Sequence, residues 1–300
     1  MTSLRTRRLA AALGGGAAAG LLWAAGVERR WYALRHATVP VLDATATRPL
    51  RVLHLTDLHQ LPGQRHRLDF VRACSQAGPD VVVATGDLLE SNDSIDEVVA
   101  ALADVAQGRV ALAVLGAHDY WGPTAKSPTD YLFAPDRRRY GTRLDTARLV
   151  GGLTDAGYEV MDNRRATVKT PAGLIDVAGL GDPHVRFDQP DLVSTVAPAE
   201  EVALRLGLVH APYRAALDQL ADRGMDLVLS GHTHGGQLRL PGFGALVNNC
   251  DLPLRQSRGL SRYGDDLWLH VSAGLGHSKF APVRFACRPE ATILDLVAKA

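Results

Sequence analysis

Short apolar runs alternate with amphipathic segments along most of the chain. Three runs, 51–57 (RVLHLTD), 80–87 (DVVVATGD) and 110–119 (VALAVLGAHD), are rich in aliphatic residues and end in polar residues at a glycine or aspartate. Such runs predict strands. Apolar residues at helical spacing predict intervening helices over about 67–77 and 94–106. Strands that alternate with helices are typical of an α/β domain.

The second half of the chain repeats this design. The runs 204–210 (LRLGLVH) and 225–234 (MDLVLSGHTH) are again apolar and again end in polar residues. Functional groups of α/β sheets gather just beyond the carboxyl ends of strands, so we expect the polar residues at these five strand ends to share one rim. Shorter strands are predicted over 158–169, 174–179, 237–248, 267–272 and 292–297.

The N-terminus carries an uncharged apolar run, Leu9–Val27, between two arginine clusters. At about 1.5 Å per residue, this run just reaches across a hydrocarbon core of roughly 30 Å. We therefore predict a signal or transmembrane anchor over 1–30, a linker over 31–49 and one globular domain over 50–300. The run has no polar face, which disfavours a buried amphipathic helix. Arginines flank it on both sides, so cleavage and orientation in the membrane stay open.

Overall charge and cysteine content exclude some classes of function but indicate none. The chain has 33 Lys and Arg residues against 32 Asp and Glu residues, a formal net charge of +1. It therefore lacks the basic field of a nucleic-acid binder, and no binding to nucleic-acid duplexes is expected. Its three cysteines are widely spaced and form no C-x-x-C motif. The pattern indicates neither a disulfide framework nor a thiolate zinc site.

Histidines and aspartates follow the predicted strands at five places. Neutral imidazole and carboxylate are ligands of Zn, Mn and Fe. Side chains two residues apart on an extended backbone point the same way, so two D-x-H or H-x-H pairs could each face inward. A single buried histidine is more often a hydrogen-bonded core residue, but five such fragments in order favour a metal site. The candidates are Asp57, His59, Asp87, His118, Asp119, His210, His232 and His234.

The fragments read TDLH, TGDL, GAHD, VHAP and SGHTHGGQ. In this order they resemble the D-x-H, G-D, G-N-H-D/E, H and G-H-x-H motifs of calcineurin-like metallophosphoesterases. The stretch GHTHGGQLRLPGFGA is similar to the small bacterial, membrane-associated phosphodiesterase branch. The resemblance covers roughly 50–298 and implies a sandwich of two mixed β-sheets flanked by helices, with the metals at the sheet edge.

By this resemblance, the domain would hold two divalent metal ions, Mn, Fe or Zn, and a water between them would become hydroxide and attack phosphorus. His118 would protonate the departing oxygen or stabilise charge on the phosphate, and Asp119 would orient His118 through a hydrogen bond. The implied metal ligands are Asp57, His59 and His234 for the first ion, His210 and His232 for the second, and Asp87 as the bridge. His184 and His277 lie on expected loops near the rim and could assist.

Ala117 departs from this pattern, because the family has a metal-coordinating asparagine at its position. Water can fill the place of a neutral amide oxygen, so we expect a weakened second metal site rather than a lost one. The leading hypothesis is a phosphodiesterase of lipid- or envelope-associated substrates, held at the membrane by the N-terminal segment. The alternatives are a nucleotide phosphodiesterase or phosphomonoesterase, and a degenerate, non-catalytic metal- or phosphate-binding protein.

Overall fold

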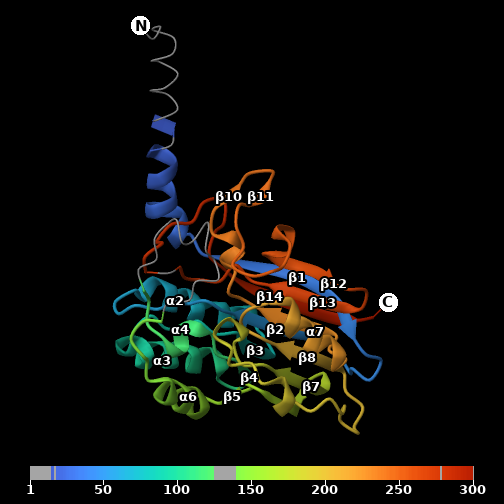
Figure 1. Cartoon of the computed structure of the whole chain (residues 1–300). Coiled ribbons are helices and arrows are strands. Elements are labelled where there is room, and N and C mark those ends of the chain that lie inside the picture. The colour runs from blue at the N-terminus through green and yellow to red at the C-terminus, as the bar shows by residue number, and fades with distance from the viewer. Residues whose placement is uncertain (1–14, 17, 125–139, 278, 300) are drawn as a thin grey trace, which may run out of the picture.

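Two mixed six-stranded sheets pack face to face in the computed structural model of the chain (Figure 1). The structure describes residues 15–16, 18–124, 140–277 and 279–299. The first sheet has the order β1-β14-β2-β3-β4-β5, and the second has the order β12-β13-β9-β8-β7-β6. A separate hairpin, β10–β11, follows β9 in the chain. The predicted α/β sandwich is confirmed.

The central strands of both sheets are parallel, and their bounds follow the apolar runs. The first sheet contains β1 (Ala33–Leu42), β2 (Leu50–Leu55), β3 (Val81–Ala84), β4 (Val110–Ala113), β5 (Tyr158–Val160) and β14 (Glu290–Ala298). The second contains β6 (Arg164–Thr170), β7 (Gly173–Gly179), β8 (Leu204–Leu208), β9 (Leu227–Ser230), β12 (Gly259–Tyr263) and β13 (Leu267–Val271). The hairpin strands are β10 (Arg239–Leu240) and β11 (Gly244–Ala245).

Helices cover the outer faces of the sandwich. The α-helices are α2 (Arg65–Ala73), α3 (Ile95–Ala106), α4 (Ala117–Tyr120), α6 (Thr146–Asp155) and α7 (Arg214–Asp222). The 3-10 turns and one π-helical turn are η1 (Trp23–Val27), η2 (Glu28–Arg30), η3 (Cys74–Ala77), η4 (Asn92–Ser94), η5 (Pro183–Val185), η6 (Pro190–Leu192), η7 (His234–Gly236) and η8 (Leu254–Gln256). In Figure 1, α2, α3 and α6 lie beside the first sheet, and α7 lies beside the second.

The hydrophobic core is layered in the same way. One cluster, which includes Val52, Val83 and Leu206, fills the space between the sheets. A second joins α2, α3 and α6 to the first sheet, and a third joins α7 to the second sheet. The four residues of β3 are all buried, as expected for a strand covered on both faces. Helix α3 buries Ile95 and Val98 on the apolar stripe that its sequence predicts.

The prediction of a linker over 31–49 is wrong for its first half. Strand β1 occupies Ala33–Leu42 and pairs in parallel with β14 at the edge of the first sheet. Val39 and Val41 are buried between the sheets, and Pro40 is tolerated because β1 is an edge strand. Half of the predicted anchor, 1–14 and residue 17, lies outside the described residues. In the described part of the chain, no helix combines the length and apolar character needed to cross a bilayer.

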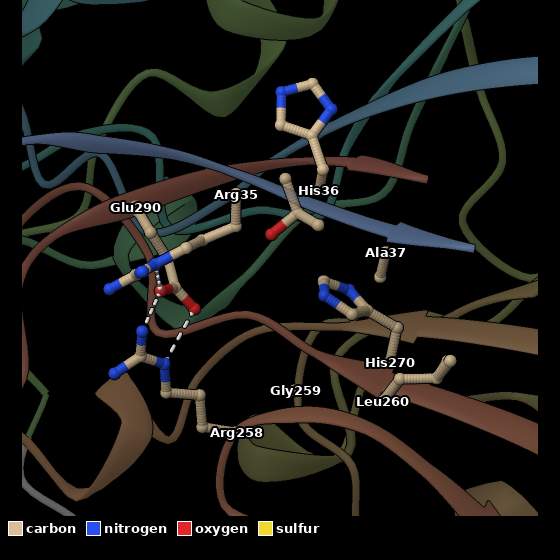
Figure 2. A pocket seen from close by; sticks show the side chains of 9 residues that line it. Arg35, His36, Ala37, Arg258, Gly259, Leu260, His270 and Glu290 are labelled. Atoms are coloured by element: carbon tan, nitrogen blue, oxygen red, sulfur yellow. Dashed lines mark hydrogen bonds and ion pairs between the residues drawn. The ribbon is translucent and has the colours of Figure 1, made fainter. Parts of the chain in front are cut away.

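A buried carboxylate of the first sheet links β1 to the second sheet at one end of the sandwich. Glu290, the first residue of β14, accepts hydrogen bonds from both Arg258 and Arg35, and from the Ala273 amide at 3.2 Å. These side chains line a crevice of about 270 Å³ between β1 and β12, and Figure 2 shows Glu290 facing Arg258. The ion pairs of Glu290 with Arg35 and Arg258 therefore form part of the wall of this crevice.

We expect Glu290→Gln to lower the free energy of unfolding by about 1.5–3 kcal/mol, because hydrogen bonds to a buried charge are lost. The urea midpoint measures this change. Asp295→Asn is the matched control, since its partner Arg51 is exposed and such pairs contribute less than about 1 kcal/mol. Equal shifts in the two variants would contradict a structural role for Glu290.

Candidate metal centre

The carboxyl ends of four parallel strands, two from each sheet, meet at one edge of the sandwich. In the first sheet, β2 and β3 end in register at Leu55 and Ala84, just before the first predicted ligands. In the second sheet, β8 and β9 lead into the others. The structure brings all six predicted metal ligands together there. They form three overlapping groups, and within each group the donor atoms lie within 4.8 Å of one another. The groups are Asp57, His59 and His234; His59, Asp87 and His118; and Asp87, His210 and His232.

Asp87 lies at the centre of this arrangement. Its Oδ2 atom is 3.4 Å from His59 Nε2 and 3.3 Å from His210 Nε2. Its Oδ1 atom accepts a hydrogen bond of 2.7 Å from the His118 amide. One carboxylate oxygen therefore faces an imidazole from each sheet, while the other oxygen fixes the carboxylate to the short helix α4. Asp87 therefore belongs to two of the three donor groups.

The paired ligands converge through left-handed backbone, not through the extended backbone that the sequence predicts. Strand β2 ends two residues before Asp57, and β9 ends two residues before His232. Asp57 and His59 have φ of 50° and 44°, and His232 and His234 have φ of 67° and 50°. Non-glycine residues rarely adopt this region, and such strain clusters at functional sites. The backbone therefore holds these ligands at some conformational cost.

Two glycines allow the backbone segments around the cluster to pack closely. Gly86 has φ of +85°, and a Cβ atom there would lie 2.3 Å from the Gly116 amide nitrogen. A Cβ atom at Gly231 would lie 2.1 Å from Thr56 Oγ1 and 2.3 Å from Asp57 Oδ2. Any side chain at either position would push the metal-binding loops apart.

Backbone carbonyl groups set the orientation of two imidazole rings. His210 Nδ1 lies 2.6 Å from Thr85 O, so this nitrogen carries the proton and Nε2 turns toward Asp87. His232 Nε2 lies 3.1 Å from Asn249 O, which leaves Nδ1 free of its proton. Metal-ligating histidines usually donate their other N–H in this way. Both rings are therefore oriented with a lone pair toward the cluster.

Glu90 is a site residue that the sequence did not reveal. It is buried, and its Oε1 atom lies 2.8 Å from His59 Nδ1 and 3.5 Å from His118 Nδ1. Burial alone would raise the pKa of Glu90, but hydrogen bonding with His118 and His59 lowers it to about 2. A negative carboxylate behind His59 directs its Nε2 atom into the cluster. Its position three residues after Asp87, in GDLLE, is the only signal in the sequence.

We expect Glu90→Gln to weaken the affinity of the cluster for Mn²⁺ about 10- to 100-fold, as is common when such a supporting carboxylate is lost. Isothermal titration with Mn²⁺ measures the affinity. Glu97→Gln serves as the control, because Glu97 accepts a hydrogen bond from Gln60 and belongs to none of the three donor groups. An unchanged affinity in the Glu90 variant would remove this residue from the support of His59.

Asp119 does not orient His118 by a direct hydrogen bond, contrary to the prediction. Its two carboxylate oxygens accept hydrogen bonds from the amides of Leu88 (2.8 Å) and Gly116 (2.9 Å). Burial and the nearby charge of Asp87 raise the pKa of Asp119 to about 7. Asp119 therefore shapes the turn that presents His118, and Glu90 is the carboxylate beside the His118 ring.

The electrostatics of the cluster suit cations. Burial would raise the pKa of Asp57 and Asp87, but the neighbouring histidines lower both below the ordinary aspartate value. Burial lowers the pKa of His232 to about 4 and also lowers that of His234, which keeps both rings neutral. In the described part of the chain, the buried His210 Nε2 atom has no hydrogen-bond partner. Burial would lower the pKa of His59 and His210, but the neighbouring carboxylates raise it, to about 10 for His59. A divalent ion would therefore displace protons from these two rings. The ionised carboxylates and the neutral His232 and His234 rings are ligands that divalent metal ions accept.

Three further residues surround the cluster. Arg284 is fully buried and lies 3.3 Å from His234 Nδ1 while donating to the carbonyls of the loop after β13. Asp182 follows β7 and is also fully buried. Burial raises the pKa of Asp182 to about 7, while His210 lowers it and Asp87 raises it further. The His184 ring, expected near the rim, lies 4.6 Å from the His232 ring. No pattern in the sequence marks Arg284 as buried.

Comparison with known proteins places this geometry in a family. Residues 50–236 match the calcineurin-like phosphoesterase family. Phosphodiesterase YaeI of Escherichia coli (strain K12) is 30% identical over 279 residues, which cover 90% of each chain. UDP-2,3-diacylglucosamine pyrophosphatase LpxG of Chlamydia trachomatis is 24% identical to this chain. The matched region spans 82% of this chain and 83% of LpxG. The crystal structure of TT1561 of Thermus thermophilus superposes on this chain with a TM-score of 0.43 at 12% identity. The superposed region spans 76% of this chain and 91% of TT1561.

Proposed function

The chain belongs to the calcineurin-like phosphoesterase family and is a hydrolase of phosphoester bonds, and from this premise we propose that it is a dinuclear metal phosphodiesterase. The observation that carries the proposal is the position of Asp87 Oδ2, which faces His59 of one donor group and His210 of the other. A single shared carboxylate between two donor groups suits two cations held close together.

Each residue of the cluster then has a defined task. Two bound divalent ions would lower the pKa of a water between them and stabilise charge on the phosphate. Asp57, His59 and His234 would hold the first ion, and His210 and His232 the second, with Asp87 shared. Glu90 and the carbonyl groups of Thr85 and Asn249 would keep the imidazole rings in place.

His118 is the proposed proton donor to the departing oxygen. Its side chain is 26% exposed, whereas those of His59 and His210 are almost fully buried, so a substrate can reach it. Glu90 Oε1 lies 3.5 Å from its Nδ1 atom, so a negative charge stands beside the ring.

The proposed substrate is a phosphodiester attached to a lipid or to an envelope component. Two observations support this choice. The relatives include a phosphodiesterase and a pyrophosphatase of a diacylated sugar nucleotide. The apolar run near the N-terminus also suits a membrane-associated or exported enzyme. A nucleotide phosphodiesterase or a phosphomonoesterase would use the same cluster, and the substrate comparison decides between them.

Hydrolysis of a bis-aryl phosphate with added Mn²⁺ tests the activity, and the monoaryl phosphate tests the monoesterase alternative. Turnover of the diester at a rate above the monoester is expected. Absence of turnover in the folded protein would favour the degenerate, metal-binding alternative that Ala117 suggests.

Ala117 contributes no metal-binding atom, so we expect Ala117→Asn to raise the affinity for the second metal ion about 10- to 100-fold. Competition with a fluorescent chelator measures the two affinities separately. Ala117→Ser is the control, since its hydroxyl is shorter than the asparagine amide. An unchanged affinity in Ala117→Asn would indicate that Asp182 already supplies the oxygen, because its buried Oδ2 atom has no hydrogen-bond partner in the described residues. Asp182→Asn would then lower the second affinity.

A further inference from the structure

Large apolar side chains are exposed on the hairpin formed by β10 and β11. Phe243, at the turn, is 91% exposed. Leu240 and Leu246, on either side of it, are about half exposed, and Leu238 at the base is also exposed. The hairpin projects from the sandwich in Figure 1. A protruding hairpin with an apolar turn is suited to insertion into the outer part of a lipid bilayer.

The hairpin is fixed directly to the metal-binding loop. His234 begins η7, and β10 starts three residues after this turn ends. A Cβ atom on Gly236 would lie 2.5 Å from Ala245 Cβ, so β11 packs against the end of η7. Arg239 donates a hydrogen bond to Gly235 O at 2.8 Å. The position of the hairpin therefore sets the position of the metal cluster relative to whatever the hairpin contacts.

The apolar segment near the N-terminus lies at the same end of the molecule. The Arg284 amide donates to Ala24 O, and Gly20 lies against the Phe285 ring. Phe285 in turn forms a β-bridge with Leu238 at the base of the hairpin. Figure 1 shows the N-terminal helix and the β10–β11 hairpin rising on the same side of the sandwich. Exposed apolar residues on this segment are Leu21, Leu22, Trp23, Val27 and Trp31.

The charges of this surface are almost all positive. We define the docking surface as residues 18–31, 237–248 and 279–288, in which Glu28 is the only acidic residue. Glu28 is buried, where it accepts hydrogen bonds from Trp23 Nε1 and the Cys287 amide. The cationic residues of this surface are Arg29, Arg30, Arg239, Lys279 and Arg288, whereas Arg284 is buried beside His234. Apolar side chains surrounded by cations, with tryptophans at the margin, match an anionic bilayer surface.

We propose that the β10–β11 hairpin docks, beside the N-terminal helix, on the surface of an anionic phospholipid bilayer and holds the metal cluster at the level of the lipid headgroups. The inference rests on the proposed function, because it gives the metal cluster access to phosphodiesters of membrane lipids. It also extends that function, because the hairpin is a membrane contact separate from the N-terminal segment.

The test places an environment-sensitive NBD dye at the turn of the hairpin. Phe243→Cys is labelled in the full chain with Cys250→Ser, since Cys74 and Cys287 are buried. We expect stronger, blue-shifted emission on vesicles of phosphatidylcholine with phosphatidylglycerol, and a weaker response on phosphatidylcholine alone. Val196→Cys is the matched control, because Val196 is exposed and apolar but lies beside β6, where Arg165 contacts Ser194. Its dye should not respond.

Cosedimentation with the same vesicles gives the affinity. Phe243→Ser should weaken binding about 10-fold, because it removes one large side chain from the bilayer contact, and Val196→Ser should leave binding unchanged. Equal dye responses at positions 243 and 196 would overturn the proposal. So would a response at 243 that grows with protein concentration without vesicles, which would indicate self-association. The labelled chain with Asp87→Asn should still respond, so loss of docking and loss of hydrolysis are distinguishable.

Discussion

Asp87→Asn is expected to remove both metal ions from the protein and to lower the turnover of a bis-aryl phosphate by more than about 100-fold, beyond the loss typical of a supporting residue. The reason is the shared position of its carboxylate. Oδ2 faces His59 and His210, so the substitution weakens both donor groups at once. The neutral amide also removes the negative charge that favours two adjacent cations. Metal content by mass spectrometry, together with the hydrolysis rate, measures both effects.

Asp162→Asn is the matched control for this variant. Asp162 is also a carboxylate at this end of the sandwich, but its oxygens accept hydrogen bonds from the Leu115 amide and from the Tyr120 hydroxyl group. Its substitution should leave the metal content unchanged. If the Asp87 variant retained one tightly bound ion and part of the turnover, Asp87 would serve one ion alone and the bridging role would be wrong.

His118→Asn is expected to lower turnover about 100- to 10,000-fold for substrates with alkyl leaving groups, the range for loss of a general acid. An aryl oxide leaves without a proton more readily than an alkoxide, so the loss should be smaller for a nitrophenyl ester. The metal content should stay unchanged, because Asp57, Asp87 and the other four proposed ligands are retained. Rates across a series of leaving groups, with metal content measured alongside, give the result.

Equal losses for good and poor leaving groups would contradict proton donation by His118. A simultaneous loss of metal would instead place His118 among the ligands, which its group with His59 and Asp87 also allows. Tyr120→Phe is a suitable control on the same short helix, since the Tyr120 hydroxyl group donates to Asp162 and not to the cluster.

The sequence predicted the parts of the fold that depend on local pattern. The apolar runs before Asp57, Asp87 and His232 are strands, and their ends do share one edge. Strand β1 was missed because its partner β14 comes from the opposite end of the chain, and no local signal marks such a pairing. The short strand β12 was missed too, since GLSRY has neither an apolar run nor a clear alternation.

In the candidate site too, the features set by local sequence were predictable and those set by distant segments were not. Residue type and order were enough to predict the cluster, because imidazole and carboxylate groups at successive strand ends are typical of a metal site. Orientation could not be predicted. The left-handed backbone at Asp57 and His232 depends on packing by Gly231 and Gly274 from distant segments. The contact between Glu90 and His118 likewise depends on how two loops from neighbouring strands meet.

The pairing of β1 with β14 also has a consequence for biosynthesis. Strand β14 lies between β1 and β2, so it separates the first two strands of the domain that a ribosome would make. Neither strand has this neighbour until β14 has left the exit tunnel. The first sheet therefore completes only after β14 has emerged, while α3 and the local β3–β4 unit can form earlier. Nascent chains that stall before Glu290 would expose the inner edge of β2 to chaperones and proteases.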